Sequence, residues 1–394
     1  MSINKYIYFI LSLLVFLVSP IFSLPLILIM IFEKKKGAIL LISFFMGYVS
    51  YMVKPSILMD LSRYYEYYET FDRGSYNDFI FFLSRQPDKL YYIFLYIGTR
   101  LGLRFQEFLF IITTFNFYVI LSLYDYFTKT LQLKKANNFF SFIVYFLSVS
   151  FLYYLMATRF TFATSFFLIC LISYFKKKYV LFIAFFILAI FTHTSFLFFI
   201  PIILLVHFLG KRKKIFYLII LLGLVVNILP TDLLFSIFSL NEGFSKKVGT
   251  YMSLERQVSI IPVISHTLFV CLAIVVYINL YKYAKRGNEY CDQLFNLFSI
   301  CLLGILFTIF QGYIVVDRFI MICKPIFLIV FIVMLNYNMI KNKLQLKFIY
   351  GLCIVVSLFY VSIIYKGTFN NLLDPQYLLT PSIIELNYHS SMFK

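Results

Sequence analysis

Residues 37–71 read GAILLISFFMGYVSYMVKPSILMDLSRYYEYYETF. The first part, 37–53, is apolar over nearly the length that a membrane span needs, about 20 residues. The second part, 59–71, crowds acids, an arginine and tyrosines into one stretch of helical length. The abrupt change predicts a membrane helix that is followed almost at once by a polar, aromatic helix outside the bilayer.

The composition extends this pattern to the whole chain. Of 394 residues, 62% are hydrophobic and 13% are charged, whereas soluble domains are about 45–50% apolar. The apolar excess suffices for about twelve spans, so we expect one all-α, polytopic integral membrane domain over 1–394. The expected spans are 6–32, 37–53, 105–127, 139–156, 158–175, 179–192, 194–210, 215–230, 265–283, 294–312, 318–336 and 348–365.

The net charge of +18 would suit a nucleic-acid partner, but its placement argues for a membrane. More than half of the 35 lysines and arginines lie in short gaps between apolar runs. Short basic loops stay in the cytoplasm. The charge therefore predicts topology, with both termini outside, a lipid bilayer as surroundings and no nucleic-acid partner. These gaps carry Lys34–Lys36, Lys129 with Lys134 and Lys135, Lys176–Lys178, Lys211–Lys214, Lys282 with Lys285 and Arg286, and Lys341 with Lys343 and Lys347.

Two long segments, 54–104 and 231–264, then lie on the outer side, which is the periplasm in a bacterium. Ser75 and Asp78 have capping-box spacing, so the first segment is expected to contain helices. Residues 88–103 are apolar but short, and we interpret them as a re-entrant or surface-lying helix. The pair 179–192 and 194–210 is interpreted as a short hairpin with its tip recessed below the outer surface.

The opening stretch supplies the first candidate site. As a helix, it places Asp60, Arg63, Tyr64, Tyr67, Tyr68 and Phe71 on one face. Aromatic rings pack on sugars, and an arginine binds phosphate oxygens through a fork of donors. The alternative is an interfacial helix with a tyrosine belt and a solvated ion pair.

Charges at three further outer helix starts extend the candidate site. Arg159 opens one expected span, His193 precedes another, and Asp317 with Arg318 opens a third. Helix N-termini attract anions, and ionisable groups within spans are candidates for function. The alternative is that each arginine is an interface anchor. No metal-ligand pattern or Gly-rich phosphate loop is recognisable, so neither metal nor cofactor is expected.

The order of these motifs resembles Wzy-type and EpsG-like polysaccharide (O-antigen) polymerases over most of residues 30–340. The resemblance rests on a basic loop, a span and then Asp-x-x-Arg-Tyr-Tyr at 60–65. It also rests on MATRFTFATSFFL at 156–168, His-Thr-Ser at 193–195 and Arg-Phe at 318–319. Such a resemblance implies a membrane-embedded, GT-C-like glycosyltransferase fold.

The resemblance also implies an activity, a location and partners. Such enzymes join oligosaccharide repeat units carried on undecaprenyl diphosphate at the periplasmic face of the bacterial inner membrane, and a chain-length regulator membrane protein is a further implied partner. Arg63, Arg159 and Arg318 would hold the diphosphate, while Tyr64 and Tyr67 would contact sugar. His193 is the first choice for the catalytic base, with Asp60 and Asp317 as alternatives.

Three other functions compete with polymerisation. A transporter or lipid-sugar flippase would suit the number of spans, although the chain shows no matching halves. A membrane acyltransferase would also use an embedded histidine. An O-antigen ligase would attach a finished chain to a lipid core instead of extending it.

Overall fold

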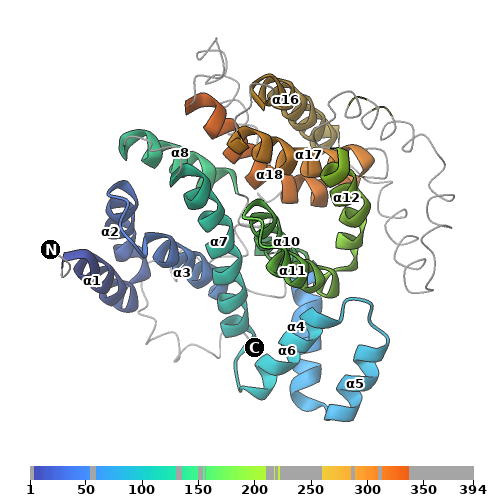
Figure 1. The fold of residues 1–394 in the computed structure, drawn as a ribbon. Coiled ribbons are helices and arrows are strands. Elements are labelled where there is room, and N and C mark those ends of the chain that lie inside the picture. The colour runs from blue at the N-terminus through green and yellow to red at the C-terminus, as the bar shows by residue number, and fades with distance from the viewer. Residues whose placement is uncertain are drawn as a thin grey trace. The chain divides into compact units, whose positions relative to one another are not determined.

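The computed structural model describes residues 4–53, 59–129, 135–149, 154–155, 157–209, 217, 221, 260–284, 289–308 and 313–336. Within these ranges the regular structure is helical, with no β-strand, which confirms the all-α prediction (Figure 1). The predicted span 348–365 lies outside the described residues, as do nearly all of 215–230 and most of the outer segment 231–264. The total of about twelve spans stays a prediction.

The chain forms two compact units. The first contains the described residues up to Ile169 together with Phe191–His193, and the second contains Cys170–Ile190 and the described residues from Thr194 onward. The expectation of a single transmembrane domain stays a prediction.

The first unit is built on a close pair of helices, α3 (Ala38–Tyr51) and α7 (Phe105–Lys129). Gly47 of α3 permits their approach, because a Cβ atom there would lie 2.1 Å from the Thr114 hydroxyl and 2.8 Å from the Phe110 carbonyl oxygen. Ser50 donates a hydrogen bond to the Leu109 carbonyl oxygen at 3.3 Å. The end of α3 therefore lies beside the start of α7.

The predicted single span 6–32 is wrong. The structure divides it into α1 (Asn4–Val18) and α2 (Pro20–Phe32), because proline at position 20 lacks the N–H that would continue α1. The two halves fold back on each other, with Ser12 Oγ 3.2 Å from Met30 Sδ. They rise about 22 and 20 Å, less than the hydrocarbon core of about 30 Å.

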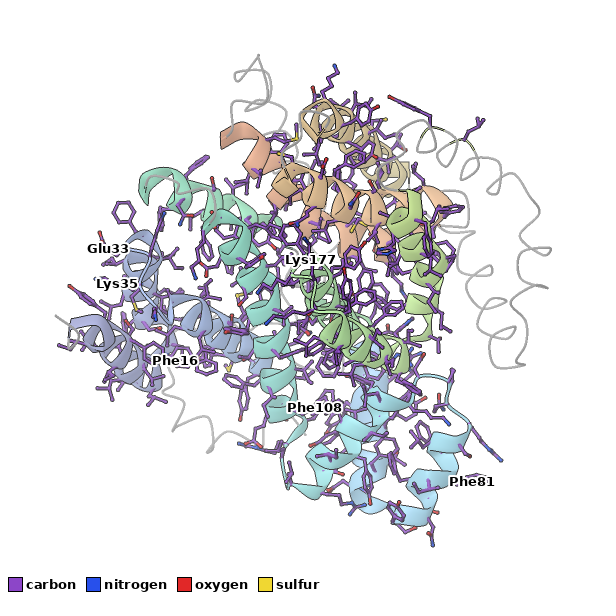
Figure 2. All side chains as sticks on the ribbon, viewed as in Figure 1. Phe16, Glu33, Lys35, Phe81, Phe108 and Lys177 are labelled. Atoms are coloured by element: carbon purple, nitrogen blue, oxygen red, sulfur yellow. The ribbon has the colours of Figure 1, made fainter. Side chains whose placement is uncertain are left out.

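This hairpin also changes the expected topology. Lys35, labelled in Figure 2, places its Nζ atom 5.0 Å from the centre of the Tyr8 ring. The start of α1 therefore lies at the same end as Lys34–Lys36. The prediction of an outside N-terminus required one full crossing by 6–32, so it loses its basis.

The outer segment folds into three helices, α4 (Met59–Arg73), α5 (Tyr76–Ser84) and α6 (Lys89–Arg100). The capping box of Ser75 and Asp78 is present at the start of α5, as predicted. Aromatic rings join the three helices: Phe71 packs against Phe79, and Phe79 stacks on Tyr96 at 4.0 Å. Helices in 54–104 are therefore confirmed.

Three described helices are long and apolar enough to cross a membrane: Phe105–Lys129, Thr158–Phe175 and Cys291–Thr308. The spans predicted at 158–175 and 179–192 coincide with α10 (Thr158–Phe175) and α11 (Tyr179–Thr192). The span predicted at 139–156 corresponds to α8 (Lys135–Ser148). The short helix expected within 88–103 is α6, which is not among these apolar helices.

The second unit contains η2 (Thr194–Phe198), α12 (Phe199–Leu209), α16 (Ile260–Ala284), α17 (Glu289–Thr308) and α18 (Tyr313–Asn336). Phe199 and Phe319 stack at 5.3 Å, and both rings approach Gly304 of α17. Tyr174 near the end of α10 lies 3.0 Å from His207 Nδ1 near the end of α12. The chain therefore leaves this end along α11 and returns to it along α12, as the predicted hairpin requires.

Candidate functional site

The helix α4 presents two kinds of residue on the face that the sequence singled out. Tyr64, Tyr68 and Phe71 are buried, whereas Asp60 and Arg63 lie toward solvent. Tyr68 donates a hydrogen bond to the Leu103 carbonyl oxygen at 2.7 Å, so it fastens α4 to the chain before α7. Of the predicted face, Tyr68 and Phe71 are therefore packing residues.

Arg159 is the centre of a cluster of charged and aromatic side chains, which also contains Arg63, Tyr64, Tyr67, Asp88, Tyr91 and Tyr92. It is the second residue of α10 and its side chain is 9% exposed. Nη1 lies 3.2 Å from Oδ2 of Asp88, which is fully buried, and donates a hydrogen bond to the Tyr92 hydroxyl at 3.0 Å. The sequence placed an anionic ligand at this arginine, and the structure places a carboxylate of the protein there.

Aromatic faces complete the surroundings of Arg159. Its guanidinium lies 5.9 Å from the centre of the Tyr64 ring and 5.8 Å from that of Tyr92. Such contacts stabilise a cation that has lost water. Tyr64 also packs edge-on against Tyr91 at 5.0 Å, and Tyr67 packs edge-on against Tyr92 at 5.6 Å.

Asp88 occupies an unusual position for its role. It is the residue before the first turn of α6, where an aspartate normally accepts hydrogen bonds from the helix N–H groups. Its side chain makes no such bond and contacts Arg159 instead. The positive end of the α6 dipole still stabilises the carboxylate, so α6 positions a negative charge for α10.

Arg63 also lies near the Tyr64 ring, and its side chain is exposed to solvent. Its guanidinium is 5.4 Å from the centre of the Tyr64 ring, and its Nη2 atom is 2.8 Å from Asp60 Oδ1. The side chains of Arg63 and Asp60 are 47% and 35% exposed. The pair is therefore a solvated ion pair at the entrance to the buried cluster.

The tyrosines of the cluster are neutral hydrogen-bonding groups. Burial raises the pKa of Tyr92 to about 12, although the Arg159 charge acts in the opposite direction. Burial likewise raises the pKa of Tyr64 and of Tyr91. None of these phenols loses its proton near neutral pH, so the cluster presents hydroxyl groups and cations.

His193 lies at the same end of α10. It directly follows α11, is 8% exposed, and packs edge-on against Phe160, with ring centres 5.2 Å apart. Phe160 is the residue after Arg159. The structure therefore brings together the predicted site residues Arg63, Tyr64, Tyr67 and Arg159, with Asp60 at the exposed edge, and places His193 against the ring next in sequence to Arg159.

Asp317 and Arg318 are placed differently from the prediction. The helix α18 begins at Tyr313, so both residues lie in its second turn and not at its start. The free N–H groups that attract anions belong to the first turn. The argument that Arg318 marks a helix N-terminus is therefore corrected. Both residues belong to the second unit, and their convergence with Arg159 stays a prediction.

Asp88, Tyr91 and Tyr92 were not among the predicted site residues. The available signal was the sequence DKLYY at 88–92, an acid and two phenols at the start of the short apolar helix. Its burial against α10 depends on tertiary packing, which the pattern does not encode. In the described ranges, no group of three or more His, Cys, Asp or Glu residues is arranged to hold a metal ion.

Comparison with known proteins gives one match. The model of the family described as "EpsG family" matches residues 56–375, which include every residue of this cluster. Neither a curated protein nor a solved structure matches the chain.

Proposed function

The chain belongs to the EpsG family, and on that premise we propose that it is a membrane glycosyltransferase that polymerises oligosaccharide repeat units carried on undecaprenyl diphosphate. The family is that of polysaccharide polymerase-like membrane proteins. The proposed product is O-antigen or a related surface polysaccharide, and the proposed site faces the periplasm of a bacterial inner membrane.

The observation that carries the proposal is the cluster of two arginines and three tyrosines at the start of α10. Arg63 and Arg159 both lie near the Tyr64 ring, Arg159 also lies near the Tyr92 ring, and Tyr67 packs against Tyr92. A sugar diphosphate offers both of the groups that such a cluster binds, phosphate oxygens for guanidinium and sugar C–H faces for aromatic rings. Arg63, Tyr64 and Tyr67 belong to α4 and Tyr92 to α6, neither of which is among the long apolar helices, whereas Arg159 begins α10, which is one of them.

The proposed reaction needs modest help from the protein. A hydroxyl oxygen of the incoming lipid-linked unit forms a bond to the anomeric carbon of the growing chain. The bond from that carbon to the lipid diphosphate breaks, and the diphosphate leaves with the electron pair. The hydroxyl proton passes to a base. Electrostatic stabilisation of the leaving diphosphate is the largest contribution expected of the site.

The roles follow from exposure. Arg63 is the accessible cation and contacts the diphosphate first, while Arg159 is held behind the Tyr64 ring by Asp88. His193 accepts the proton, since histidine is the side chain that most often serves as a general base. Asp60 and Asp317 are the alternative bases, and Arg318 is a further proposed ligand of the diphosphate.

The test compares two histidines in a strain that lacks the gene for this protein. His193→Ala should abolish chain extension at normal protein level, because general base catalysis contributes about 10²–10⁴-fold. His207→Ala, at the other end of the hairpin beside Tyr174, should leave chain length normal.

The glycan of the deletion strain tests the competing functions at the same time. Single repeat units in the surface glycan support a polymerase. Absence of every repeat unit would indicate a flippase or ligase, and full-length chains without acetyl groups would indicate an acyltransferase. Full-length chains in the His193 variant would move the base to Asp60 or Asp317.

A further inference from the structure

A cavity of about 720 Å³ lies in the first unit between the α2–α3 turn, the second half of α7 and the start of α8. It is far from the arginine–tyrosine cluster. The cluster adjoins the chain just before α7, where Tyr68 bonds to Leu103, whereas the cavity includes Lys129 at the end of α7. A helix of the length of α7 (Phe105–Lys129) rises about 37 Å, so the two sites occupy opposite ends.

The rim of the cavity is strongly basic. Lys34, Lys35 and Lys36 line it together with Lys129. One acid, Asp125, also lines it and forms an ion pair with Lys129. The remaining excess of positive charge comes from Lys34–Lys36, which are consecutive on one turn. Lys34 in this turn has a φ of 53°, and Gly37, the residue after Lys36, has a φ of 85°.

The backbone adds to this charge. The helix α3 begins at Ala38, and Gly37, Ala38 and Ile39 line the cavity. The first N–H groups of a helix have no intrahelical partner and carry the positive end of its dipole. The cavity therefore combines lysine side chains with a helix N-terminus, both of which favour a phosphate.

Apolar side chains form another part of the lining. Leu40, Tyr118 and Phe142 line the cavity together with the lysines. Tyr124 donates a hydrogen bond to the Asn138 carbonyl oxygen at 2.9 Å, which fastens α8 to α7 across the wall. A soluble anion would leave these apolar walls without a partner, whereas a lipid would cover them with its acyl chains.

We infer that this cavity binds the headgroup of an acidic phospholipid, with the phosphate at Lys34–Lys36 and the start of α3 and an acyl chain along α7 and α8. Basic pockets between membrane helices on the cytoplasmic side are suited to anionic headgroups. The charge rule predicts the cytoplasmic side for Lys34–Lys36. The inference does not depend on the proposed polymerase reaction.

The test measures binding of a short-chain acidic lipid to the full-length protein in a non-ionic detergent. Dioctanoyl phosphatidylglycerol is titrated, and an apparent dissociation constant is taken from the rise in unfolding temperature. Each basic residue near an anionic surface contributes about fivefold in affinity. The K34Q/K35Q/K36Q variant should therefore bind about tenfold to a hundredfold more weakly. The matched control K176Q/K177Q/K178Q removes the same charge from the basic turn after α10 and should bind as the unchanged protein does.

A second variant keeps every lysine and fills the space. Ser122 lines the cavity and is half-buried, so Ser122→Phe should weaken lipid binding while the charge stays the same. This variant separates occupation of the cavity from any effect of the lysines on folding or topology.

The two further probes are dioctanoyl phosphatidylcholine and inorganic phosphate. Both should bind at least about tenfold more weakly than the acidic lipid, since one lacks net charge and the other lacks acyl chains. Equal binding of the two lipids would overturn the inference, as would full saturation by inorganic phosphate. Equal losses in the two lysine variants would also overturn it, because general charge would then explain the binding.

Discussion

Two arginines flank one tyrosine in this protein, and they differ in almost every other respect. Arg63 lies 5.4 Å from the centre of the Tyr64 ring and Arg159 lies 5.9 Å from it. Arg63 is 47% exposed and pairs with Asp60 one helical turn away. Arg159 is 9% exposed and pairs with Asp88, which is remote in sequence and fully buried.

The difference separates a structural charge from an accessible one. A guanidinium at the start of α10 opposes the helix dipole, and burial removes its water. Asp88 and the rings of Tyr64 and Tyr92 offset both costs. Arg63 does not lose its water of hydration in this way, because its side chain keeps contact with solvent. The predicted ligand anion therefore has an open approach at Arg63, whereas Arg159 contacts a carboxylate of the chain itself.

The largest expected effect is that of breaking the buried pair. Asp88→Asn keeps the size of the side chain but removes the charge that offsets Arg159, and loss of one partner of a buried pair costs about 3–5 kcal/mol. We expect low membrane abundance and a clear fall in unfolding temperature. Asp60→Asn is the matched control, because an exposed pair contributes about 0–1 kcal/mol.

A double variant sharpens this result. Replacing both partners with apolar residues, Asp88→Leu with Arg159→Met, should restore much of the lost stability, since buried pairs are often replaceable in this way. The polymer chains made by this double variant should nevertheless be short, because the Arg159 cation is missing. Wild-type stability in Asp88→Asn alone would contradict the role given to Asp88.

The second effect is that of changing the shape of the buried cation. Arg159→Lys keeps the charge but loses the planar guanidinium, whose Nη1 atom contacts both Asp88 and the Tyr92 hydroxyl and whose plane lies near the Tyr64 and Tyr92 rings. A hydrogen bond to a charged group contributes about 1.5–3 kcal/mol, so the loss of stability should be smaller than in Asp88→Asn. Chain length should fall in the same variant.

The alternative interpretation gives the opposite result for that substitution. An interface anchor would tolerate lysine, because lysine also extends its charge toward the membrane surface. Full-length polymer together with normal membrane abundance in Arg159→Lys would therefore show that Arg159 is only an anchor.

The contrast also explains which parts of the molecule could be predicted. The end of α10 and the start of α11 follow from two apolar runs that the lysine turn 176–178 separates, and the structure reproduces them. The break between α1 and α2 depends on Pro20 within a continuous apolar run, where length favoured one span. Arg159 stands out because a charge in a span is rare. Asp88 does not, because an aspartate before a helix usually serves as a cap.

The smallest effect on stability is expected at Arg63, and it tests the comparison most directly. Arg63→Ala removes one partner of an exposed pair, so the free energy of unfolding should change by at most about 1 kcal/mol. The same change removes the accessible cation beside Tyr64, so chain length should fall sharply.

Arg73→Ala is the matched control for Arg63→Ala. Arg73 also belongs to α4, pairs with Glu69 at 3.0 Å and is 80% exposed, but none of the ring contacts of the cluster involves it. Chain-length distribution and membrane abundance are measured for both variants. Short chains in Arg63→Ala with normal chains in Arg73→Ala would assign the diphosphate to the exposed arginine. Normal chains in both would leave Arg63 as a solvated ion pair on an interfacial helix and would return the diphosphate to Arg159.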